Sequence, residues 1–362
     1  MRLAWFVTPH GFGHAARTAA ILEEVYERFP EIEVELWSWL PEWFWRDALR
    51  GRYRLRPFPV DVGVVQRSPV AEDPWATFQR LENWWLWEVE PRWGELMRAL
   101  ERSRVQAVVA DIAPLGVELA HAVGLPALLV ENFTWDWIYE GFVEQVPGLR
   151  IWMERFRRSV ELADRHWAIE PYGPPKQNPS IEVLPPIARR LRSSREAVRA
   201  RLGVAPGQAL VVVSFGGISG PPPPTSRTCS GRSVFAVVGS VPTERWEGMF
   251  RFLPHRCPIY HPDLLHAADL WVGKPGYSSV VELARAGTRA LVVPRPGFPE
   301  SEFLERWLQE TVPVCRLKVD SLHDGSWVEM ALAWLEKPPG RPRETSGASE
   351  AAKRLLRWLE SL

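Results

Sequence analysis

The stretch Val7-Thr8-Pro9-His10-Gly11-Phe12-Gly13-His14-Ala15-Ala16-Arg17 lies near the N-terminus, between an apolar run and an amphipathic segment. The run Leu3–Thr8 predicts a buried strand, and Ala15–Phe29 carries apolar residues at helical spacing. Glycines at a strand-to-helix turn let the backbone approach a ligand, and the free N–H groups of the helix start favour an anion. The stretch therefore predicts the first strand–turn–helix unit of an α/β domain.

The same stretch differs from two common nucleotide-binding turns. A dinucleotide fingerprint needs a third glycine where Ala16 stands, and a P-loop needs a lysine followed by serine or threonine, which the stretch lacks. Instead, His14 follows the glycines directly, and an imidazole at that place acts as a general base or holds a phosphate. These residues alone support a structural turn and an active site equally well.

Length, charge and cysteine content narrow the class of protein. A chain of 362 residues suggests two domains, and equal numbers of basic and acidic residues, 44 each, provide no global field for nucleic acid. Cys229, Cys257 and Cys315 form no CxxC pair, which argues against zinc and fits a reducing compartment. The run Leu3–Val7 is too short for a signal peptide and no apolar run is long enough to span a bilayer, so we expect a cytoplasmic protein.

Strand and helix patterns alternate along both halves of the sequence. Apolar runs such as Ala107–Ala110 and Ala209–Ser214 are followed by turn residues and then by helical patterns. This alternation predicts two doubly wound α/β domains with parallel sheets. Proline-rich sequence separates the halves. The expected divisions are a first domain over residues 1–170, a linker over 171–190, a second domain over 191–345 and a terminal helix over 346–362.

Tryptophans cluster in the first half, at Trp37, Trp39, Trp43 and Trp45 and again over residues 84–87. We interpret them as apolar anchors of a core rather than as aromatic platforms in a cleft. Peripheral membrane contact through them is compatible with the sequence, which does not require it.

A second turn with polar residues is Gly273–Glu282, GKPGYSSVVE, which also joins a predicted strand to a helix. Gly276 opens the helix, and Ser278 and Ser279 offer hydroxyls and amides at the positive end of its dipole. Glu282 stands one turn further along, where it either binds ribose hydroxyls or forms a capping box with Ser279. The turn predicts a diphosphate site.

Three further groups of polar residues follow predicted strands. Arg295, Glu300 and Glu302 follow the strand Ala290–Val293, at the end of an open sheet where ligands bind. Arg295 is suited to phosphate and the two glutamates to sugar hydroxyls, the alternative being a solvated loop. The other two groups are Phe215-Gly216-Gly217 and Asn132-Phe133-Thr134-Trp135-Asp136-Trp137.

The paired layout resembles a GT-B glycosyltransferase, in which two Rossmann-like domains face each other across a cleft. The loop with His14 and the segment GYSSVVELARAGTRALVVP are similar to parts of the lipid-linked N-acetylglucosaminyltransferase of peptidoglycan synthesis. The sequence resembles more closely the glycosyltransferase-like amino-terminal region of L-arabinokinases and its bacterial relatives. The matching segments, in order, are VTPHGFGHAAR, ENFTWDWIYEGF, IARRLRSSREAVRARLG, SFGG, YHPDLLHAADLWVGKPGYSSVVELA and VVPRPGFPESEFL.

The resemblance implies a role for each matching residue. Donor diphosphate would face Gly216, Gly217, Gly276, Ser278 and Ser279. Glu282 would hold the ribose, Glu300 and Glu302 the sugar, and the segment around His261 and Asp263 the base. His14 would be the catalytic base or a phosphate contact, with Asp111 and Asp136 as other candidate bases. The acceptor-side loop and its neighbours would comprise His10, Gly11, Gly13, Arg17, Asn132 and Trp135.

These observations predict a glycosyltransferase that moves a sugar from a nucleotide diphosphate sugar, with a UDP-sugar as the expected donor. No Asp-x-Asp motif occurs, so we expect no metal and no cofactor, with helix dipoles and backbone amides stabilising the leaving diphosphate. The alternatives are an epimerase or hydrolase on the same fold, and a non-catalytic nucleotide-sugar sensor.

The sequence departs from its relatives in two places. The kinase half of the arabinokinases has no counterpart, so we do not expect sugar-kinase activity. The region after Gly217 is proline-rich where many relatives in the wider superfamily have a helix.

Overall fold

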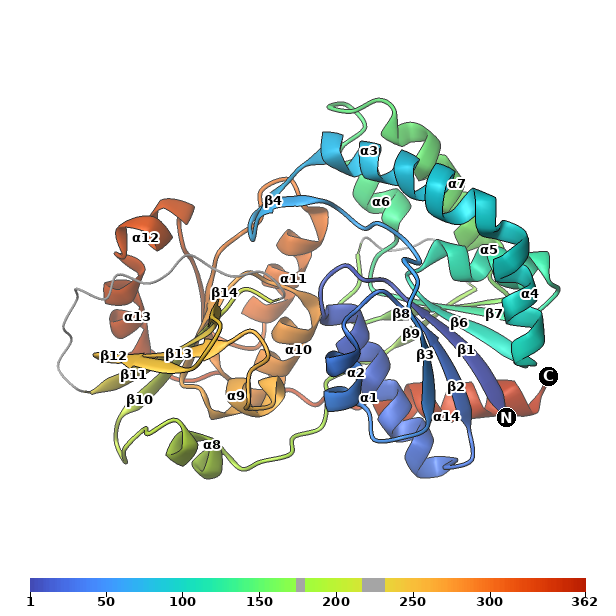
Figure 1. The fold of residues 1–362 in the computed structure, drawn as a ribbon. Helices are drawn as coiled ribbons and strands as arrows, with labels where there is room; N and C mark the ends of the chain where they lie inside the picture. The colour runs from blue at the N-terminus through green and yellow to red at the C-terminus, as the bar shows by residue number, and fades with distance from the viewer. Residues whose placement is uncertain (174–179, 217–231) are drawn as a thin grey trace.

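The computed structural model describes residues 1–173, 180–216 and 232–362 (Figure 1). The predictions for Gly217 and for the proline-rich stretch that follows it lie outside these residues, apart from Arg232.

The first sheet has the order β3-β2-β1-β6-β7-β8-β9, and every neighbouring pair is parallel. Its strands are β1 (Arg2–Val7), β2 (Glu33–Trp37), β3 (Tyr53–Arg56), β6 (Ala107–Asp111), β7 (Ala127–Glu131), β8 (Arg165–Ile169) and β9 (Ile181–Leu184). β6 and β7 are buried along their whole length, as expected for parallel strands covered on both faces. β9 belongs to this sheet although its residues lie within the proline-rich stretch expected to link the domains.

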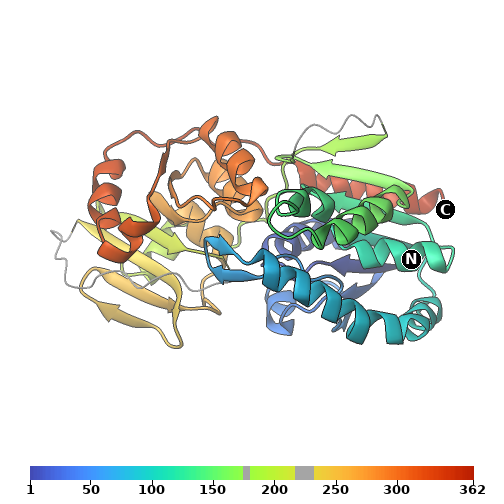
Figure 2. The same ribbon diagram turned by 90° about the horizontal axis from the view of Figure 1, so that it is seen from above.

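Helices pack on both faces of this sheet (Figures 1 and 2). They are α1 (Gly13–Arg28), α2 (Glu42–Ala48), α3 (Pro74–Asn83), the π-helical turn η1 (Trp84–Val89), the 3-10 turn η2 (Glu90–Arg92), α4 (Trp93–Ser103), α5 (Pro114–Ala122), α6 (Trp135–Glu140) and α7 (Leu149–Glu161). α3 begins where the Asp73 carboxylate accepts a hydrogen bond of 3.0 Å from the Ala76 amide, with Pro74 in the first helical position. A two-stranded hairpin of β4 (Gln66–Ser68) and β5 (Ala71–Glu72) precedes α3.

The second sheet has the order β12-β13-β11-β10-β14-β15-β16, parallel except for the antiparallel pair at β12. Its strands are β10 (Ala209–Ser214), β11 (Ser233–Val241), β12 (Arg245–Glu247), β13 (Phe250–Pro254), β14 (Leu270–Gly273), β15 (Arg289–Val292) and β16 (Val314–Arg316). The accompanying helices are α8 (Arg195–Arg201), α9 (His261–Ala267), α10 (Tyr277–Ala286), α11 (Pro299–Gln309), α12 (Val319–Asp324) and α13 (Trp327–Leu335). The predicted pair of parallel-sheet α/β units is confirmed.

The last helix, α14 (Gly347–Glu360), returns to the first sheet and packs beside α1 (Figure 1). One buried apolar cluster consequently runs through both halves and includes Leu22 of α1, Val281 of α10 and Leu355 of α14. No helix in the described part of the chain is apolar and long enough to span a bilayer.

The tryptophans of the first half do not share one environment. Trp37, Trp45 and Trp84 are buried as core anchors, as predicted. Trp39 and Trp87 are 61% and 74% exposed, and neither belongs to a core.

Candidate functional site

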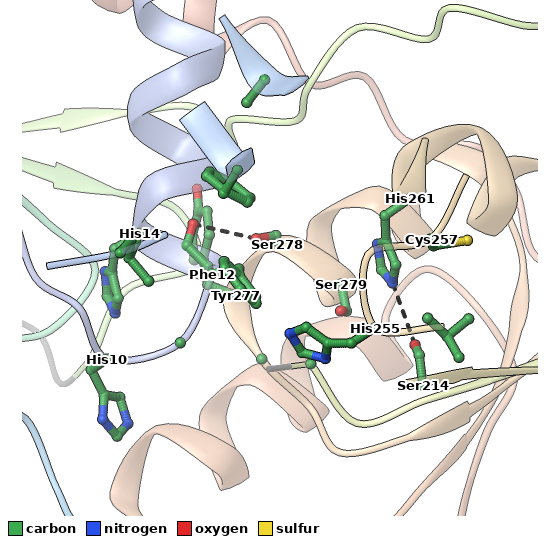
Figure 3. A pocket seen from close by; sticks show the side chains of 18 of the residues that line it. His10, Phe12, His14, Ser214, His255, Cys257, His261, Tyr277, Ser278 and Ser279 are labelled. Atoms are coloured by element: carbon green, nitrogen blue, oxygen red, sulfur yellow. Dashed lines mark hydrogen bonds between the residues drawn. The ribbon is translucent and has the colours of Figure 1, made fainter. Parts of the chain in front are cut away.

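A cleft of about 380 Å³ lies between the two halves of the molecule (Figure 3). The loops that follow β1, β10, β14 and β15 line it, so it lies at the carboxyl ends of strands from both sheets, where open α/β sheets bind ligands. Most of the predicted residues meet here: His10, Gly11, Gly13, His14, Gly216, His261, Gly276, Ser278, Ser279, Arg295 and Glu300.

His14 stands at the start of α1 with a buried carboxylate behind it. Its Nδ1 is 3.2 Å from Oδ1 of Asp111, which ends β6 and is fully buried. The adjacent strands β1 and β6 are in register, with Val7 opposite Asp111, and this pairing brings the two residues together. His14 borders the cleft, whereas Asp111 is not among the residues that line it.

Arg17 and Thr18 complete the surroundings of Asp111. Nε of Arg17 donates a hydrogen bond of 3.0 Å to Oδ2, a second guanidinium nitrogen pairs with Oδ1, and the Thr18 hydroxyl donates at 3.1 Å. Burial opposes ionisation of Asp111, but the Arg17 charge and the hydrogen bonds from His14 and Arg17 hold its pKa below the ordinary value. Asp111 is therefore a carboxylate at neutral pH.

The carboxylate determines which tautomer of His14 is present. A guanidinium nitrogen of Arg17 that donates to Asp111 also lies 3.2 Å from Nδ1 of His14, and it carries only N–H donors. Because a carboxylate only accepts hydrogen bonds, the proton of a neutral His14 belongs on Nδ1. The lone pair is then on Nε2, where it can accept a proton from a ligand.

The N-terminus of α10 meets the histidine loop across the cleft. Gly276 has no side chain with which to cap the helix, and the first N–H groups of a helix, here beside Ser278 and Ser279, have no partner within the helix itself. The Ser278 hydroxyl donates a hydrogen bond of 3.3 Å to the carbonyl of Gly13 (Figure 3). This contact holds the helix start and the start of α1 side by side. The positive end of the helix dipole at this point favours an anion.

Lys274 precedes this helix and also lines the cleft. Burial, and next the nearby charge of Arg295, lower the pKa of its ammonium group to about 7. Lys274 belongs to the predicted GKPGYSSVVE turn, but no role was predicted for it, although lysine is rare in this arginine-rich chain.

Two contacts between the halves involve predicted residues beyond β15. Arg295 donates from Nε to the Glu72 carboxylate of the β4–β5 hairpin at 2.8 Å, and both side chains are nearly fully buried. The Asn132 side-chain amide donates to Glu300 at 2.9 Å and its oxygen accepts from Arg17 at 2.6 Å. Arg295 and Glu300 therefore reach the cleft while bound to the opposite domain.

Glu282 and His261 lie at the other end of the cleft. Arg189 donates to both carboxylate oxygens of Glu282, at 2.8 and 3.3 Å, and Nδ1 of His261 lies 3.6 Å away. Glu282 is buried and is not among the residues that line the cleft. Burial opposes its ionisation, but Arg189 holds its pKa below the ordinary value. The predicted ribose contact thus has an arginine partner within the protein.

Besides Asp111, Glu282, Arg17 and Asn132, the predicted residues Asp136, Glu302 and Trp135 are not among those that line the cleft. Asp136 on α6 pairs with Arg157 at 3.5 Å, and Glu302 is an exposed residue that pairs with Arg306 at 3.4 Å on α11. Trp135 is buried and donates from Nε1 to Asp61 at 3.1 Å. The second half of the proposed loop after β15 forms α11, with Pro299 in its first turn, and this helix turns Glu302 away from Glu300.

An aromatic group lines the cleft, which fits the alternative interpretation of the tryptophans as aromatic platforms rather than the preferred one. Phe12 stacks on Phe44 with 4.9 Å between ring centroids and lies 5.7 Å from His255 of the second half. Trp43 packs against the same group. The tryptophan and phenylalanine cluster around residue 43 was visible in the sequence, but it was interpreted as core.

Within the described ranges, no group of three or more histidine, cysteine, aspartate or glutamate side chains is placed to hold a metal ion. The expectation of metal-free chemistry stays a prediction.

Among known proteins, no family model matches the chain. A curated relative is the L-arabinokinase of Arabidopsis thaliana, 27% identical over 325 residues, which are 84% of this chain and 29% of that protein. The chain therefore spans less than a third of that relative's length. The predicted similarity to this kind of sequence is confirmed.

Solved structures resemble the chain over nearly its whole length. The glycotransferase of kitacinnamycin gives a TM-score of 0.62 with 15% identity, covering 99% of this chain and 95% of that one. MurG of Acinetobacter baumannii gives a TM-score of 0.51 with 14% identity, covering 100% of this chain and 99% of that one. UGT2 of Phytolacca americana, complexed with UDP-2fluoro-glucose and pterostilbene, gives 0.55 with 13% identity and coverage of 99% of both chains. The chain has the GT-B fold. In this GT-B fold the cleft described above lies between the two Rossmann-like halves.

Proposed function

We propose that the protein is a glycosyltransferase that uses a nucleotide diphosphate sugar, with UDP as the nucleotide. The observation that carries this proposal is that His14, backed by the carboxylate of Asp111, lines the same cleft as the N-terminus of α10. The GT-B fold supports it, as does the solved structure of UGT2, which contains a UDP-sugar analogue.

The α10 N-terminus supplies the donor site. Its free amides and the Ser278 and Ser279 hydroxyls would bind the diphosphate, with Lys274 as a nearby cation. These groups also stabilise the negative charge that the diphosphate gains as it leaves. In this arrangement the protein's own dipoles and Lys274 take the place of a metal ion.

His14 supplies the base. Nε2 would accept the proton of an acceptor hydroxyl while the hydroxyl oxygen forms a bond to the anomeric carbon. The bond between that carbon and the diphosphate oxygen breaks at the same time. Asp111 would keep the imidazole in the correct tautomer and stabilise the imidazolium, a positioning role rather than direct proton transfer.

The test pairs a binding measurement with an activity measurement. Calorimetry should detect UDP and a UDP-sugar binding to the wild type. His14→Ala should leave the affinity for UDP within about twofold and lower the rate of UDP release by roughly a hundredfold or more. Failure of the wild type to bind any nucleoside diphosphate would overturn the proposal, and full activity of the variant would assign His14 to structure.

Products formed without an added acceptor separate the alternatives. A changed sugar still attached to the nucleotide, seen by NMR, would indicate an epimerase. Free sugar formed at the full enzymatic rate would indicate a hydrolase. Tight binding with no turnover for any acceptor tried would indicate a sensor.

A further inference from the structure

The β4–β5 hairpin belongs to the first domain and packs against the second. Figures 1 and 2 both show it reaching from the first domain toward the second sheet. Val70 at its tip packs against the apolar cluster that contains Val211 and Val213 of β10. Glu72 forms the buried ion pair with Arg295. The hairpin is therefore held against the second domain by an apolar contact and by a charged one.

Gln66 begins this hairpin and lines the cleft. Its side-chain Nε2 is buried and has no hydrogen-bond partner in the described part of the chain. A buried donor without a partner is unfavourable, and because Gln66 lines the cleft, a ligand bound there would supply the missing acceptor. The unpaired amide therefore indicates a bound group with an oxygen acceptor.

Neighbouring contacts place Gln66 at the histidine end of the cleft. Gln66 is the cross-strand partner of Glu72, which binds Arg295. Two residues earlier, the Val64 amide donates to Nδ1 of His10 at 3.3 Å. The segment that carries Gln66 thus runs along His10 and ends beside Arg295.

The same end of the cleft is where a donor sugar would lie. In Figure 3, Ser278 and Ser279 lie between His10 and His14 on one side and His261 on the other. With the diphosphate on the start of α10, the nucleoside and the sugar extend in opposite directions. The anomeric carbon must be within reach of an acceptor bound at His14, so the sugar occupies the side that carries His10 and Gln66.

Charges at this end disfavour an acidic sugar. Arg295 is paired with Glu72, and burial lowers the pKa of the nearby Lys274 ammonium to about 7, which reduces its positive charge. Glu300 remains as a buried carboxylate in the lining, held by Asn132. A carboxylate accepts hydrogen bonds from hydroxyls and repels another carboxylate.

We propose that Gln66 determines donor specificity by donating a hydrogen bond from Nε2 to a hydroxyl oxygen of the sugar, in a subsite that selects neutral glycosyl groups over uronosyl groups. This inference rests on the proposed function. It adds to that function a residue of the first domain that recognises the donor.

Calorimetry with UDP, UDP-glucose, UDP-galactose and UDP-glucuronate tests the proposal. The wild type should bind UDP-glucose or UDP-galactose more tightly than UDP; whichever binds more tightly is the preferred neutral sugar nucleotide. The affinity for UDP-glucuronate should be about tenfold lower than the affinity for this preferred nucleotide. Gln66→Ala should lower the affinity for the preferred neutral sugar nucleotide by roughly threefold to tenfold, which is the effect of losing one hydrogen bond. The affinity for UDP should not change. Gln66→Glu should weaken binding of the preferred neutral sugar nucleotide at least as much, because it replaces the donor with a negative charge opposite its cross-strand partner Glu72.

Arg67→Ala is the matched control. Arg67 is the next residue of the hairpin, and its side chain is 66% exposed and pairs with Asp73. This variant should bind all four nucleotides as the wild type does. If Gln66→Ala changed the affinities for UDP and for the sugar nucleotide equally, or changed neither affinity, the role of Gln66 would be overturned. A preference of the wild type for UDP-glucuronate would overturn the charge argument, whereas failure to bind even UDP would overturn the proposed function instead.

Discussion

At the scale of single residues, the site is made of ordinary side chains in unusual surroundings. His14 acquires an orientation because Asp111 is ionised behind it, and Asp111 is ionised because Arg17 is buried against it. Lys274 and Asp61 show the opposite effect, because burial favours the neutral form of each. Their pKa values make two predictions that are independent of which acceptor the protein uses.

Lys274 should make UDP binding depend on pH. Its pKa of about 7 means that the free protein carries a neutral amine above neutral pH, while a bound diphosphate favours the ammonium form. Binding above pH 7 then takes up a proton, so affinity should fall as pH rises from 7.5 to 9, by at most about tenfold per pH unit.

Calorimetry of wild type and Lys274→Met across this pH range measures the effect. The variant should bind UDP more weakly at pH 7 and show a nearly flat dependence above it. Lys318→Met, which changes an exposed lysine outside the lining of the cleft, should behave as the wild type does. Parallel pH curves for wild type and Lys274→Met would show that Lys274 is not a diphosphate contact.

Asp61 should make stability depend on pH. Burial raises the pKa of its carboxyl group to about 7, although hydrogen bonds donated by Thr8 at 2.7 Å and by Trp135 act to lower this pKa. Between the unfolded pKa near 4 and the folded value, the unfolded chain loses its proton first. The free energy of unfolding should therefore fall as pH rises through this window, by up to about 1.4 kcal/mol per pH unit, and level off above pH 7.

Denaturant unfolding at several pH values checks this, with Asp61→Asn as the comparison. The asparagine has no proton to lose and can still pair with both neighbours. It should reduce the slope between pH 5 and 7 and leave the protein more stable than the wild type at pH 8. A variant whose slope matches the wild type would assign the pH dependence to other groups.

At the scale of helices and strands, the sequence predicted the elements that a local pattern of apolar residues and glycines marks. β1, α1, β6 and β10 lie within two residues of the predicted bounds, and α10 begins directly after Gly276 as predicted, because apolar runs and glycine turns mark these ends. α11 and β9 were not predicted, since proline-rich sequence surrounds both. In α11 the proline simply occupies the first turn, where it needs no amide proton.

The candidate site was predicted less evenly than the fold. Residues directly after strand ends, such as His14 and Ser278, reach the cleft because sheet topology alone places them there. The role of Gln66 and the contact between Asn132 and Glu300 could not be predicted, because both depend on how two distant segments meet. Asn132 and Glu300 are 168 residues apart in the sequence, and nothing in either local pattern indicates their contact.

The start of α10 gives a prediction at this scale. Ser279→Asp places a carboxylate in the first turn of the helix, where it interacts favourably with the dipole. The melting temperature without ligand should stay equal to that of the wild type or rise slightly. UDP affinity should fall more than tenfold, because the carboxylate and the diphosphate compete for the same amides and repel each other.

Thermal melts with and without UDP measure both quantities on one sample, because a bound ligand raises the melting temperature by mass action. Ser279→Ala is the control, since it removes the hydroxyl without adding charge and should weaken UDP binding only a few-fold. Undiminished stabilisation of Ser279→Asp by UDP would place the diphosphate elsewhere in the cleft.

At the scale of the whole molecule, the two halves share structure as well as a ligand site. α14 follows the second domain in sequence but packs on α1 of the first, and one apolar cluster includes residues of both. Contacts across the cleft, such as Arg295 with Glu72, join the halves at a second place. Domains connected in this way should unfold together, even though each half has its own sheet.

Leu355→Ala tests this coupling. Leu355 is fully buried on α14, and truncating a buried leucine to alanine removes about 2–5 kcal/mol of stability. If the halves are coupled, the variant should show one unfolding transition, shifted as a whole to lower denaturant, with tryptophan fluorescence and circular dichroism coinciding. Leu356→Ala, one position along and only partly buried, is the matched control and should shift the transition less. Two separate transitions in the variant would show instead that α14 is the main link between domains that can unfold independently.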